Sequence, residues 1–379
     1  MIRYNITPRG EWKNKVEEIG FKYHTLDTMY WDESVYYEFS MPEIETIEKA
    51  TSELWKMCLM AVQYVIDKRL YSKFFIPQWF IPHIEKTWIS DAPSIYGRFD
   101  FTFRNGIPKL LEFNADTPTS LFESSIVQWF WLQDFNKTKD QFNSIHEKLI
   151  DYWKYLKPYL HNHTLHFTTI KETIEDLTTT EYIRDCAVQA GYQTKYIFIE
   201  DIGWDEISSE FVDLNNMPIK NIFKLYPYEW LVHECFGKNL MQDKNNTHWI
   251  EPSWKMILSN KAILPILWQL FKGHPNLLEA YFENDRHLLN NNFVIKPILS
   301  REGANISVIK NGELIAKTDG EYGEEGYIYQ ELCELSEFNG NYPMVGSWII
   351  GQEPARIGIR ESSDLITGNA SRFVPHLIS

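Results

Sequence analysis

Two carboxylates and an amide lie close together in one short stretch of the chain. Asp100 belongs to one strand-like run, and Glu112 and Asn114 belong to the next run. Carboxylate and amide oxygens are the ligands that Mg²⁺ prefers, with the remaining positions left to water and substrate phosphates. The structural alternative is a solvated strand face, because an alternating strand is usually wet on one side.

The pairing of the two runs decides which reading applies. They flank Arg104-Asn105-Gly106, a strong turn signal, and predict a hairpin. A two-residue turn would put the carboxylates of Asp100 and Glu112 on opposite faces. A three-residue loop, with Gly106 in the left-handed conformation, would pair Arg98 with Glu112. We predict the second register, because one face then collects Arg98, Asp100, Thr102, Arg104, Glu112 and Asn114.

A helix start follows the hairpin. The segment 114–120 reads NADTPTS and leads into an aromatic run at 121–135, with Ser120 and Glu123 spaced as a capping box. The N-terminus of a helix attracts anions. A metal-binding strand face beside such a terminus favours a site for Mg²⁺ and an anion over a merely polar surface.

The order of these motifs resembles a known family. The run R-x-D, eleven residues, E-x-N-A-D-T-P-T and an aromatic helix with Gln128-Trp129 is similar to the synthetase domain of glutathionylspermidine synthase, an ATP-grasp acid–amine ligase. The resemblance continues to Ile359 or beyond. It implies an α+β, ATP-grasp-like fold of the glutathione synthetase ATP-binding type, with mixed sheets and flanking helices.

The resemblance also implies a nucleotide site. Lys261, in NKAILPILW, and Lys296, in FVIKPI, would bind the phosphates of ATP, and Gly303 would let the backbone approach them. Asp100, Glu112 and Asn114 would hold one or two Mg²⁺ ions. The strand GYIYQEL would pass the adenine edge, with the base bound by backbone groups of Gln330, Glu331 and Leu332.

The remaining implied roles concern the substrates. Arg98 and Arg360 would stabilise the transferring phosphoryl group, with Arg356 as the alternative to Arg360. Leu225 stands where the family has a substrate-binding threonine, so the acid substrate can differ from glutathione. The expected substrate contacts are Thr117, Thr119, Glu175 and Asp176, although an adjacent acidic pair in a polar loop is more often solvent-facing charge.

The resemblance therefore implies an ATP- and Mg²⁺-dependent ligase that forms an amide through an acyl phosphate. Its partners would be a peptide-like acid and an amine, and the sequence does not identify either. Two alternatives stay open: a phosphotransferase that uses the same site, and a non-catalytic module that binds a nucleotide or a peptide. No nucleophilic triad is needed, because such a ligase works by positioning and charge stabilisation.

The net charge and the cysteine content give expectations about binding partners and cellular compartment. A net charge of −15 argues against nucleic-acid binding and suits a cationic substrate. The four cysteines form no CxxC spacing, and no apolar run is long enough for a signal peptide or membrane span, so we expect a cytoplasmic protein that binds no membrane. His161, His163 and His166 have no fourth ligand nearby, and we do not expect zinc. The sequence does not predict the oligomeric state, and a homodimer is one candidate.

Hydrophobic periodicity, together with the positions of Gly and Pro residues, predicts three regions. Residues 1–160 form a helical region with the metal-site hairpin and its helix, 161–250 a substrate-binding α/β subdomain, and 251–379 the nucleotide-binding and lid region. The expected helices are 10–75 (broken near Pro42), 121–135, 137–156, 180–190 and about 276–289. The expected strands include 164–169, 195–199, 293–298, 305–310, 313–317, 326–332, 347–350 and 356–360, and 171–179 is expected as a loop.

Overall fold

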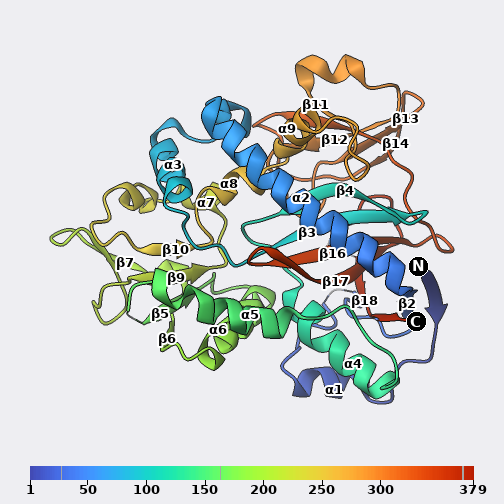
Figure 1. Ribbon diagram of the computed structural model, residues 1–379, viewed down its shortest axis with the longest axis horizontal. Helices are drawn as coiled ribbons and strands as arrows, with labels where there is room; N and C mark the ends of the chain where they lie inside the picture. The colour runs from blue at the N-terminus through green and yellow to red at the C-terminus, as the bar shows by residue number, and fades with distance from the viewer. Residues whose placement is uncertain (27, 163, 369–370) are drawn as a thin grey trace.

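The structure is a computed structural model that describes every residue except 27, 163 and 369–370. His163, one of the three histidines weighed as zinc ligands, therefore lies outside the described residues. The chain folds as a mixed α/β protein built on several sheets (Figure 1).

The central sheet joins segments that are far apart in the sequence. Its strands pair antiparallel in the order β18-β17-β16-β3-β4, so the hairpin is hydrogen-bonded directly to the C-terminal part of the chain. The strands are β3 (Tyr96–Arg104), β4 (Ile107–Asn114), β16 (Tyr342–Ile350), β17 (Glu353–Ser362) and β18 (Arg372–Val374).

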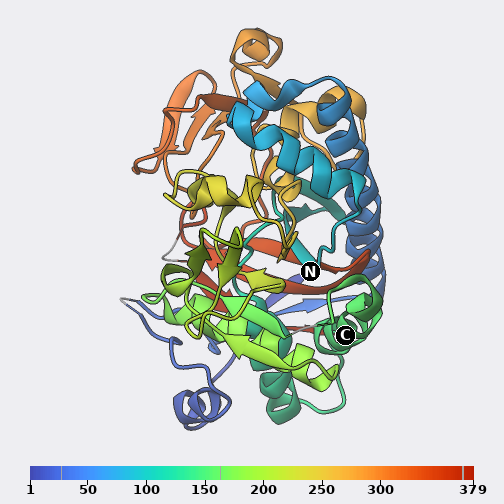
Figure 2. The same cartoon turned by 90° about the vertical axis from the view of Figure 1, so that its left-hand side faces the viewer.

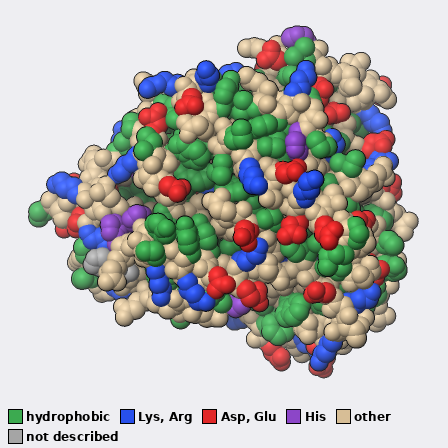
Figure 3. All heavy atoms as spheres, viewed as in Figure 1, with side chains coloured by type: hydrophobic (Ala, Val, Ile, Leu, Met, Phe, Trp, Pro, Cys, Tyr) green, Lys and Arg blue, Asp and Glu red, His purple; other side chains and the backbone are tan. Residues whose placement is uncertain are grey.

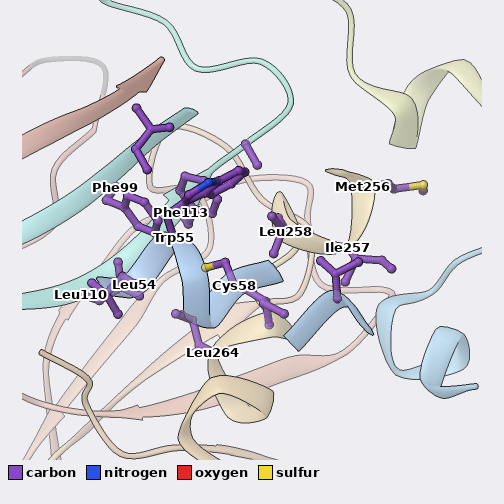
Figure 4. Packing of buried hydrophobic residues seen from close by; sticks show 14 of the residues in the cluster. Leu54, Trp55, Cys58, Phe99, Leu110, Phe113, Met256, Ile257, Leu258 and Leu264 are labelled. Atoms are coloured by element: carbon purple, nitrogen blue, oxygen red, sulfur yellow. The ribbon is translucent and has the colours of Figure 1, made fainter. Parts of the chain in front are cut away.

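One long helix, α2 (Met41–Asp67), covers the apolar face of this sheet (Figure 1). It begins with a capping box, in which the Ser40 N–H donates to the Glu43 carboxylate at 2.9 Å. The Trp55 and Phe113 rings pack with centroids 6.1 Å apart, within an apolar cluster that Figure 4 shows. Because strand residues alternate, the polar face of the hairpin is left on the side away from α2.

A second antiparallel sheet, here called the lid sheet, has the order β11-β15-β12-β13-β14. In Figure 2, α2 runs along one side of the molecule and the lid sheet lies toward the other. Asn311 and Gly312 have φ values of 54° and 82°, which confirms the predicted turn between β13 and β14. The strands are β11 (Ala280–Phe282), β12 (Phe293–Pro297), β13 (Ser307–Lys310), β14 (Glu313–Lys317) and β15 (Tyr327–Glu331).

A parallel sheet in the middle of the chain confirms the predicted βαβ unit. Its order is β10-β9-β5-β6, and α6 (Ile174–Gln189) connects β5 to β6. The strands are β5 (Leu165–Thr168), β6 (Thr194–Tyr196), β9 (Asn221–Lys224) and β10 (His248–Ile250), and a small ribbon pairs β7 (Gly203–Asp205) with β8 (Glu210–Val212).

The two chain ends meet in a small sheet with the order β1-β2-β19 (Figure 1). The strands are β1 (Ile2–Asn5), β2 (Val35–Phe39) and β19 (His376–Ile378). The remaining helices are α1 (Trp12–Glu18), α3 (Ile81–Ile89), α4 (Gln128–Phe135), α5 (Ile145–Leu156), α7 (Tyr228–Leu231), α8 (Lys255–Leu258) and α9 (Ile263–Leu270), with short 3₁₀ turns between several of them.

Several expected helices differ from the structure. Strand β2 interrupts the region predicted as helix 10–75, and Pro42 lies in the first turn of α2, where its missing N–H has no cost. The helix predicted at about 276–289 is confirmed only in part: its first half contains β11, which is fixed by its distant partner β15, and a 3₁₀ helix follows at Glu283–Leu288. The helix expected at 137–156 begins only at Ile145, and the helix expected at 180–190 begins at Ile174, within the predicted loop.

The surface over α2 is mixed in chemistry. Figure 3 shows acidic, basic and apolar side chains interspersed on that face. Within the described part of the chain, we find no helix that combines the length and apolar character needed to cross a bilayer.

Candidate active site

The hairpin turn differs from the predicted loop. Asn105 and Gly106 have φ values of 51° and 75°, as a two-residue turn of this kind requires. Arg104 pairs with Ile107 across the turn. The preferred three-residue loop, and the pairing of Arg98 with Glu112 that it implied, are therefore wrong.

A β-bulge nevertheless brings the two carboxylates together. Phe101 pairs with Leu110, but Asp100 pairs with Glu112, which leaves Leu111 as the extra residue of the bulged strand. A one-residue shift moves side chains to the other face of a strand. Asp100 and Glu112 thus share one face, as predicted, although the cause is the bulge and not the turn.

This face forms one wall of a cavity of about 930 Å³. The cavity lies between the central sheet and the lid sheet, because its lining residues come from both. The expected site residues that line it are Arg98, Asp100, Glu112, Asn114, Thr117, Thr119, Lys296, Gly303, Gln330, Glu331, Leu332 and Arg360.

Arg98 and Asp100 form a buried bidentate ion pair. The Nε and Nη2 atoms of Arg98 lie 2.7 and 2.9 Å from the two oxygens of Asp100, and Nη1 donates to the Thr119 carbonyl at 2.6 Å. Burial raises the pKa of Asp100, although the guanidinium opposes this change. A Cβ atom on Gly346 would lie 3.0 Å from Arg98 Cδ, so the small residue leaves space for the guanidinium chain.

The two predicted phosphate-binding lysines converge on Glu112. Lys261 Nζ lies 3.2 Å from Glu112 Oε2 and donates to the Ser300 carbonyl at 2.8 Å. Burial opposes ionisation of Glu112, but Lys261 and Lys296 hold its pKa at about 2. The carboxylate therefore stays ionised at neutral pH and can face a cation.

The bulge also positions Lys296. Its ammonium group donates to the Leu111 carbonyl at 2.8 Å and to Gln330 Oε1 at 2.7 Å, and Gln330 donates in turn to the Leu110 carbonyl at 3.1 Å. Burial lowers the pKa of Lys296 to about 8, with Glu112 opposing the shift. One irregularity in β4 thus aligns a carboxylate and a lysine.

The oxygen donors of this corner fit Mg²⁺. Each carboxylate oxygen of Asp100 and Glu112 has two lone pairs, so it can accept a hydrogen bond and still face a cation. Asn114 Nδ2 lies 3.0 Å from Asp100 and 3.1 Å from Glu112, and exchanging the amide nitrogen and oxygen would turn a third donor to the same point. The described residues contain no group of three His, Cys, Asp or Glu side chains that could hold a metal, so the amide is needed.

The structure separates the two candidate arginines. Arg360 lines the cavity, and its Nη2 donates to the Ser371 hydroxyl at 2.6 Å. Arg356 is completely buried and donates to the Ser125 carbonyl and to Gln141. Burial lowers the pKa of Arg356, as expected for a guanidinium enclosed by the core.

The loop between β12 and β13 contacts other segments that line the cavity. Gly303 has φ 71°, and a Cβ atom there would lie 2.6 Å from the Thr367 carbonyl. Arg301 donates to the Thr117 hydroxyl at 2.9 Å and to Glu229 at 2.5 Å. Arg301 was not among the predicted site residues, although its position two residues before the motif glycine could have indicated it.

Two backbone N–H groups next to Gln330 already donate hydrogen bonds within the protein. The Glu331 N–H donates to the Glu279 carbonyl at 2.7 Å, and the Leu332 N–H donates to the Asn292 carbonyl at 3.1 Å. A base at this edge would therefore use other backbone groups or displace these bonds. Asn292 also lines the cavity and was missed by the sequence analysis.

Glu175 and Asp176 lie in the first turn of α6, not in a loop, where acidic residues complement the helix dipole. Burial raises the pKa of Glu175, although Arg360 and the Thr119 side chain oppose the shift. Burial and the charge of Glu175 raise the pKa of Asp176 to about 7. Neither residue is among the described residues that line the cavity, and both side chains are half-buried.

A buried ion pair supports the loop after β4. Lys224 Nζ lies 2.6 Å from Asp116 Oδ1, and the Tyr228 N–H donates to the other oxygen at 3.0 Å. Both charged side chains are fully buried. Leu225, where the resemblance implies a substrate-binding threonine, is buried in the core cluster of the parallel sheet.

The chain belongs to the glutathionylspermidine synthase preATP-grasp family, whose model matches residues 3–379. It is 40% identical to a Haemophilus influenzae protein that carries the name of an acid–amine ligase, over 97% of both chains. It is 29% identical to trypanothione synthetase of Crithidia fasciculata over 82% of this chain and 51% of that one. The family members named here are C–N bond-forming enzymes, and the chain is an enzyme of this family.

Two further comparisons agree. The chain is 25% identical to the bifunctional glutathionylspermidine synthetase/amidase of Escherichia coli, over 97% of this chain and 64% of that one. A glutathione synthetase-like effector from Globodera pallida superimposes with a TM-score of 0.57 at 9% identity, covering 91% of this chain and 89% of that one. That likeness shows a shared mixed α/β fold.

Proposed function

We propose that this protein is an ATP- and Mg²⁺-dependent ligase that joins a carboxylate to an amine through an acyl phosphate. One observation carries the proposal. Asp100, Glu112 and Asn114 meet the ammonium groups of Lys261 and Lys296 at one corner of a cavity between two sheets. Oxygen donors and lysines around one point are the requirements of phosphoryl transfer.

The nucleotide would lie between the central sheet and the lid sheet, in an ATP-grasp arrangement. Lys261 and Lys296 would bind its phosphates, the loop with Gly303 would cover them, and the segment 330–332 would lie beside the base. Mg²⁺ held by Asp100, Glu112 and Asn114 would neutralise charge that develops on the phosphates. The expected division at residues 160 and 250 then gives most nucleotide contacts to 251–379, and the substrate contacts to 161–250 together with the loop after β4.

The two arginines would act on the acid substrate. Its carboxylate attacks the γ-phosphorus of ATP, and the product is an acyl phosphate and ADP. The amine then attacks the acyl carbon and releases phosphate. Arg98 and Arg360 would stabilise the negative charge of both steps, because both guanidinium groups line the cavity next to Asp100.

The substrates would enter beside the loop after β4. Thr117 and Thr119 offer hydroxyl groups to a peptide-like acid, and Glu175 and Asp176 offer negative charge to an amine. The family names glutathione and spermidine as one such pair. With Leu225 in place of the family threonine, we propose a peptide-like acid without fixing its sequence.

The test is phosphate release from ATP with Mg²⁺ across a matrix of peptides and amines. We expect release that requires both an acid and an amine, with an amide detected by mass, and loss of this activity in Asp100→Ala. Asp151→Ala, an exposed aspartate paired only with Lys154 among the described contacts, is the control and should match wild type.

The outcomes separate the alternatives. A phosphorylated product without amide would favour a phosphotransferase. ATP binding without turnover of any pair would favour a binding module, and failure to bind ATP would contradict the roles of Lys261 and Lys296.

A further inference from the structure

One nitrogen of the cavity arginine Arg360 is buried without an acceptor. Within the part of the chain that the structure describes, Nε of Arg360 has no hydrogen-bond partner. The same side chain lines the cavity between the two sheets. A buried donor without an acceptor is costly, and a ligand that supplies the acceptor removes the cost. The unpaired Nε therefore suits a guanidinium that receives an oxyanion.

The far end of the same guanidinium is held by two acceptors. Nη2 of Arg360 donates to the Ser371 hydroxyl at 2.6 Å and to the Gly368 carbonyl at 3.0 Å. The Ser371 hydroxyl donates its own proton to the Gly368 carbonyl at 2.7 Å, so a lone pair of its oxygen is left to face the arginine. Because the guanidinium is planar and rigid, fixing Nη2 also limits the directions that Nε can take.

The strand β18, which begins directly after Ser371, is fixed by the N-terminal segment as well as by β17. The Phe373 N–H donates to the Tyr30 carbonyl at 2.6 Å, and the Asp32 N–H donates to the Phe373 carbonyl at 3.0 Å. The rings of Trp31 and Phe373 stack with centroids 5.7 Å apart. Ser371, which is 1% exposed, therefore has a fixed place at the start of this strand.

An ion-pair network ties β17 and β18 together beside Arg360. Arg372 donates to Asp32 at 2.6 Å and to Glu361 at 2.5 Å, and both carboxylates are fully buried. Buried networks with their hydrogen bonds made rigidify the structure around them. Glu361 directly follows Arg360 in the chain, and Arg372 directly follows Ser371. The network thus holds both ends of the contact between Arg360 and Ser371.

Resting on the proposed function, we infer that Ser371 is a positioning residue for the ligase reaction. Its hydroxyl, together with the Gly368 carbonyl, holds Nη2 of Arg360 and leaves Nε for an oxygen of the substrate carboxylate or of the transferring phosphoryl group. Ser371 is not among the described residues that line the cavity, so it acts through Arg360 and does not touch the substrate. A serine that only stabilised the fold would make the same hydrogen bonds, and the experiment has to separate these two roles.

The test is steady-state kinetics of Ser371→Ala in the full chain, with ATP, Mg²⁺, glutathione and spermidine as the probe substrates. We expect kcat to fall roughly 10-fold, because a guanidinium that can turn spends less time in the productive orientation. The KM for ATP should stay unchanged. Ser371→Thr keeps the hydroxyl and should keep most of the wild-type kcat. If Ser371→Ala does not fold, Ser371→Cys keeps nearly the same size with a much weaker acceptor, and its kcat should fall in the same way.

Ser362 offers a matched control. It is the last residue of β17 and is buried, and its hydroxyl accepts from the Asp364 N–H at 3.0 Å. None of its described hydrogen bonds reaches Arg360. Ser362→Ala should therefore keep the wild-type kcat even where it lowers the urea midpoint. Equal losses of kcat in Ser362→Ala and Ser371→Ala, or a wild-type kcat in Ser371→Ala, would overturn the inference.

A second readout does not depend on catalysis. In arginine-selective NMR, slow rotation about the Nε–Cζ bond gives separate signals for Nη1 and Nη2. We expect separate signals for Arg360 in wild type, assigned through their loss in Arg360→Lys, and merged signals in Ser371→Ala. Signals that are the same in both proteins would contradict the positioning role. If wild type forms no amide from the probe substrates, the proposed function fails for that pair, and the NMR comparison still decides whether Ser371 orients Arg360.

Discussion

Two lysine–carboxylate pairs, about the same loop, differ in how completely they are satisfied. Lys224 and Asp116 are both fully buried, and the Tyr226 carbonyl and the Tyr228 N–H complete their hydrogen bonds. In the second pair Glu112, the partner of Lys261, lines the cavity, and its side chain remains 29% exposed. The first pair has no room for another partner, and the second can exchange one ammonium–carboxylate contact for a phosphate. The buried Lys224–Asp116 pair, with its hydrogen bonds completed, is here called the scaffold pair. The partly exposed Lys261–Glu112 pair is called the working pair.

Breaking the scaffold pair should give the largest loss of stability. In Lys224→Met, Asp116 is left buried without its cation, and we expect the free energy of unfolding to fall by about 3–5 kcal/mol. Lys261→Met is the matched variant at the cavity, and its cost should stay within about 1 kcal/mol because Lys296 remains beside Glu112. Urea unfolding of both variants measures the difference. Equal losses would contradict the distinction.

Replacing Asp100, on the proposed metal-binding face of the hairpin, should remove activity. In Asp100→Asn the side-chain shape is kept, but the negative charge that would ligate the metal and that accepts hydrogen bonds from Arg98 is lost. We expect the rate of amide formation to fall by roughly 10²–10³-fold. Far-ultraviolet circular dichroism should be that of wild type. A variant that keeps most of its activity would exclude Asp100 from the metal site.

The cavity lysine should make ATP binding depend on pH. The pKa of Lys296 is lowered to about 8, chiefly by burial, so the phosphate-binding ammonium form is lost as the pH rises above that value. We expect the Kd for ATP to rise by up to about tenfold per pH unit above 8. Isothermal titration calorimetry measures it, and Lys296→Arg should remove this dependence.

The same shift has a consequence for folding. Between pH 8 and the unperturbed value of 10.5, the unfolded chain binds more protons at this residue than the folded chain. The contribution of Lys296 to stability should therefore rise with pH over this window.

The smallest effect should come from the hairpin turn. Gly106 has φ 75° and open space around its Cβ position, so Gly106→Ala adds only backbone strain. We expect a loss of about 1 kcal/mol in unfolding free energy with unchanged activity. Gly303→Ala has a similar φ but meets the Thr367 carbonyl, so it should also raise the KM for ATP. Identical behaviour of the two variants would show that the Gly303 loop is not part of the site.

The alternation of apolar and polar residues, together with the turn residues, was enough to predict the hairpin and its polar face. They could not predict the bulge at Leu111, because an extra residue in one strand is set by contacts with Lys296 and Gln330 from a distant segment. The strand β11 was missed for the same reason, since it is defined by pairing with β15. Long-range pairing is absent from local periodicity.

The site was predicted mainly from the order of family motifs. That order indicated the residues that line the cavity, and it left Arg356 and Arg360 as alternatives. The structure places Arg360 at the cavity and Arg356 in the core. Glu123 has the spacing of a capping residue in the sequence, but it is fully buried and accepts a hydrogen bond from the Tyr30 hydroxyl, because its position depends on the packing of segments that spacing does not describe.

The central claim is that the acid is activated as an acyl phosphate, and isotope transfer tests it most directly. An acid substrate labelled with ¹⁸O in its carboxylate is converted with ATP and the amine, and the released phosphate is analysed by mass. We expect one labelled oxygen in phosphate for each amide formed, because the carboxylate oxygen attacks the γ-phosphorus. Amide formation with unlabelled phosphate, or with the label in AMP, would contradict the account.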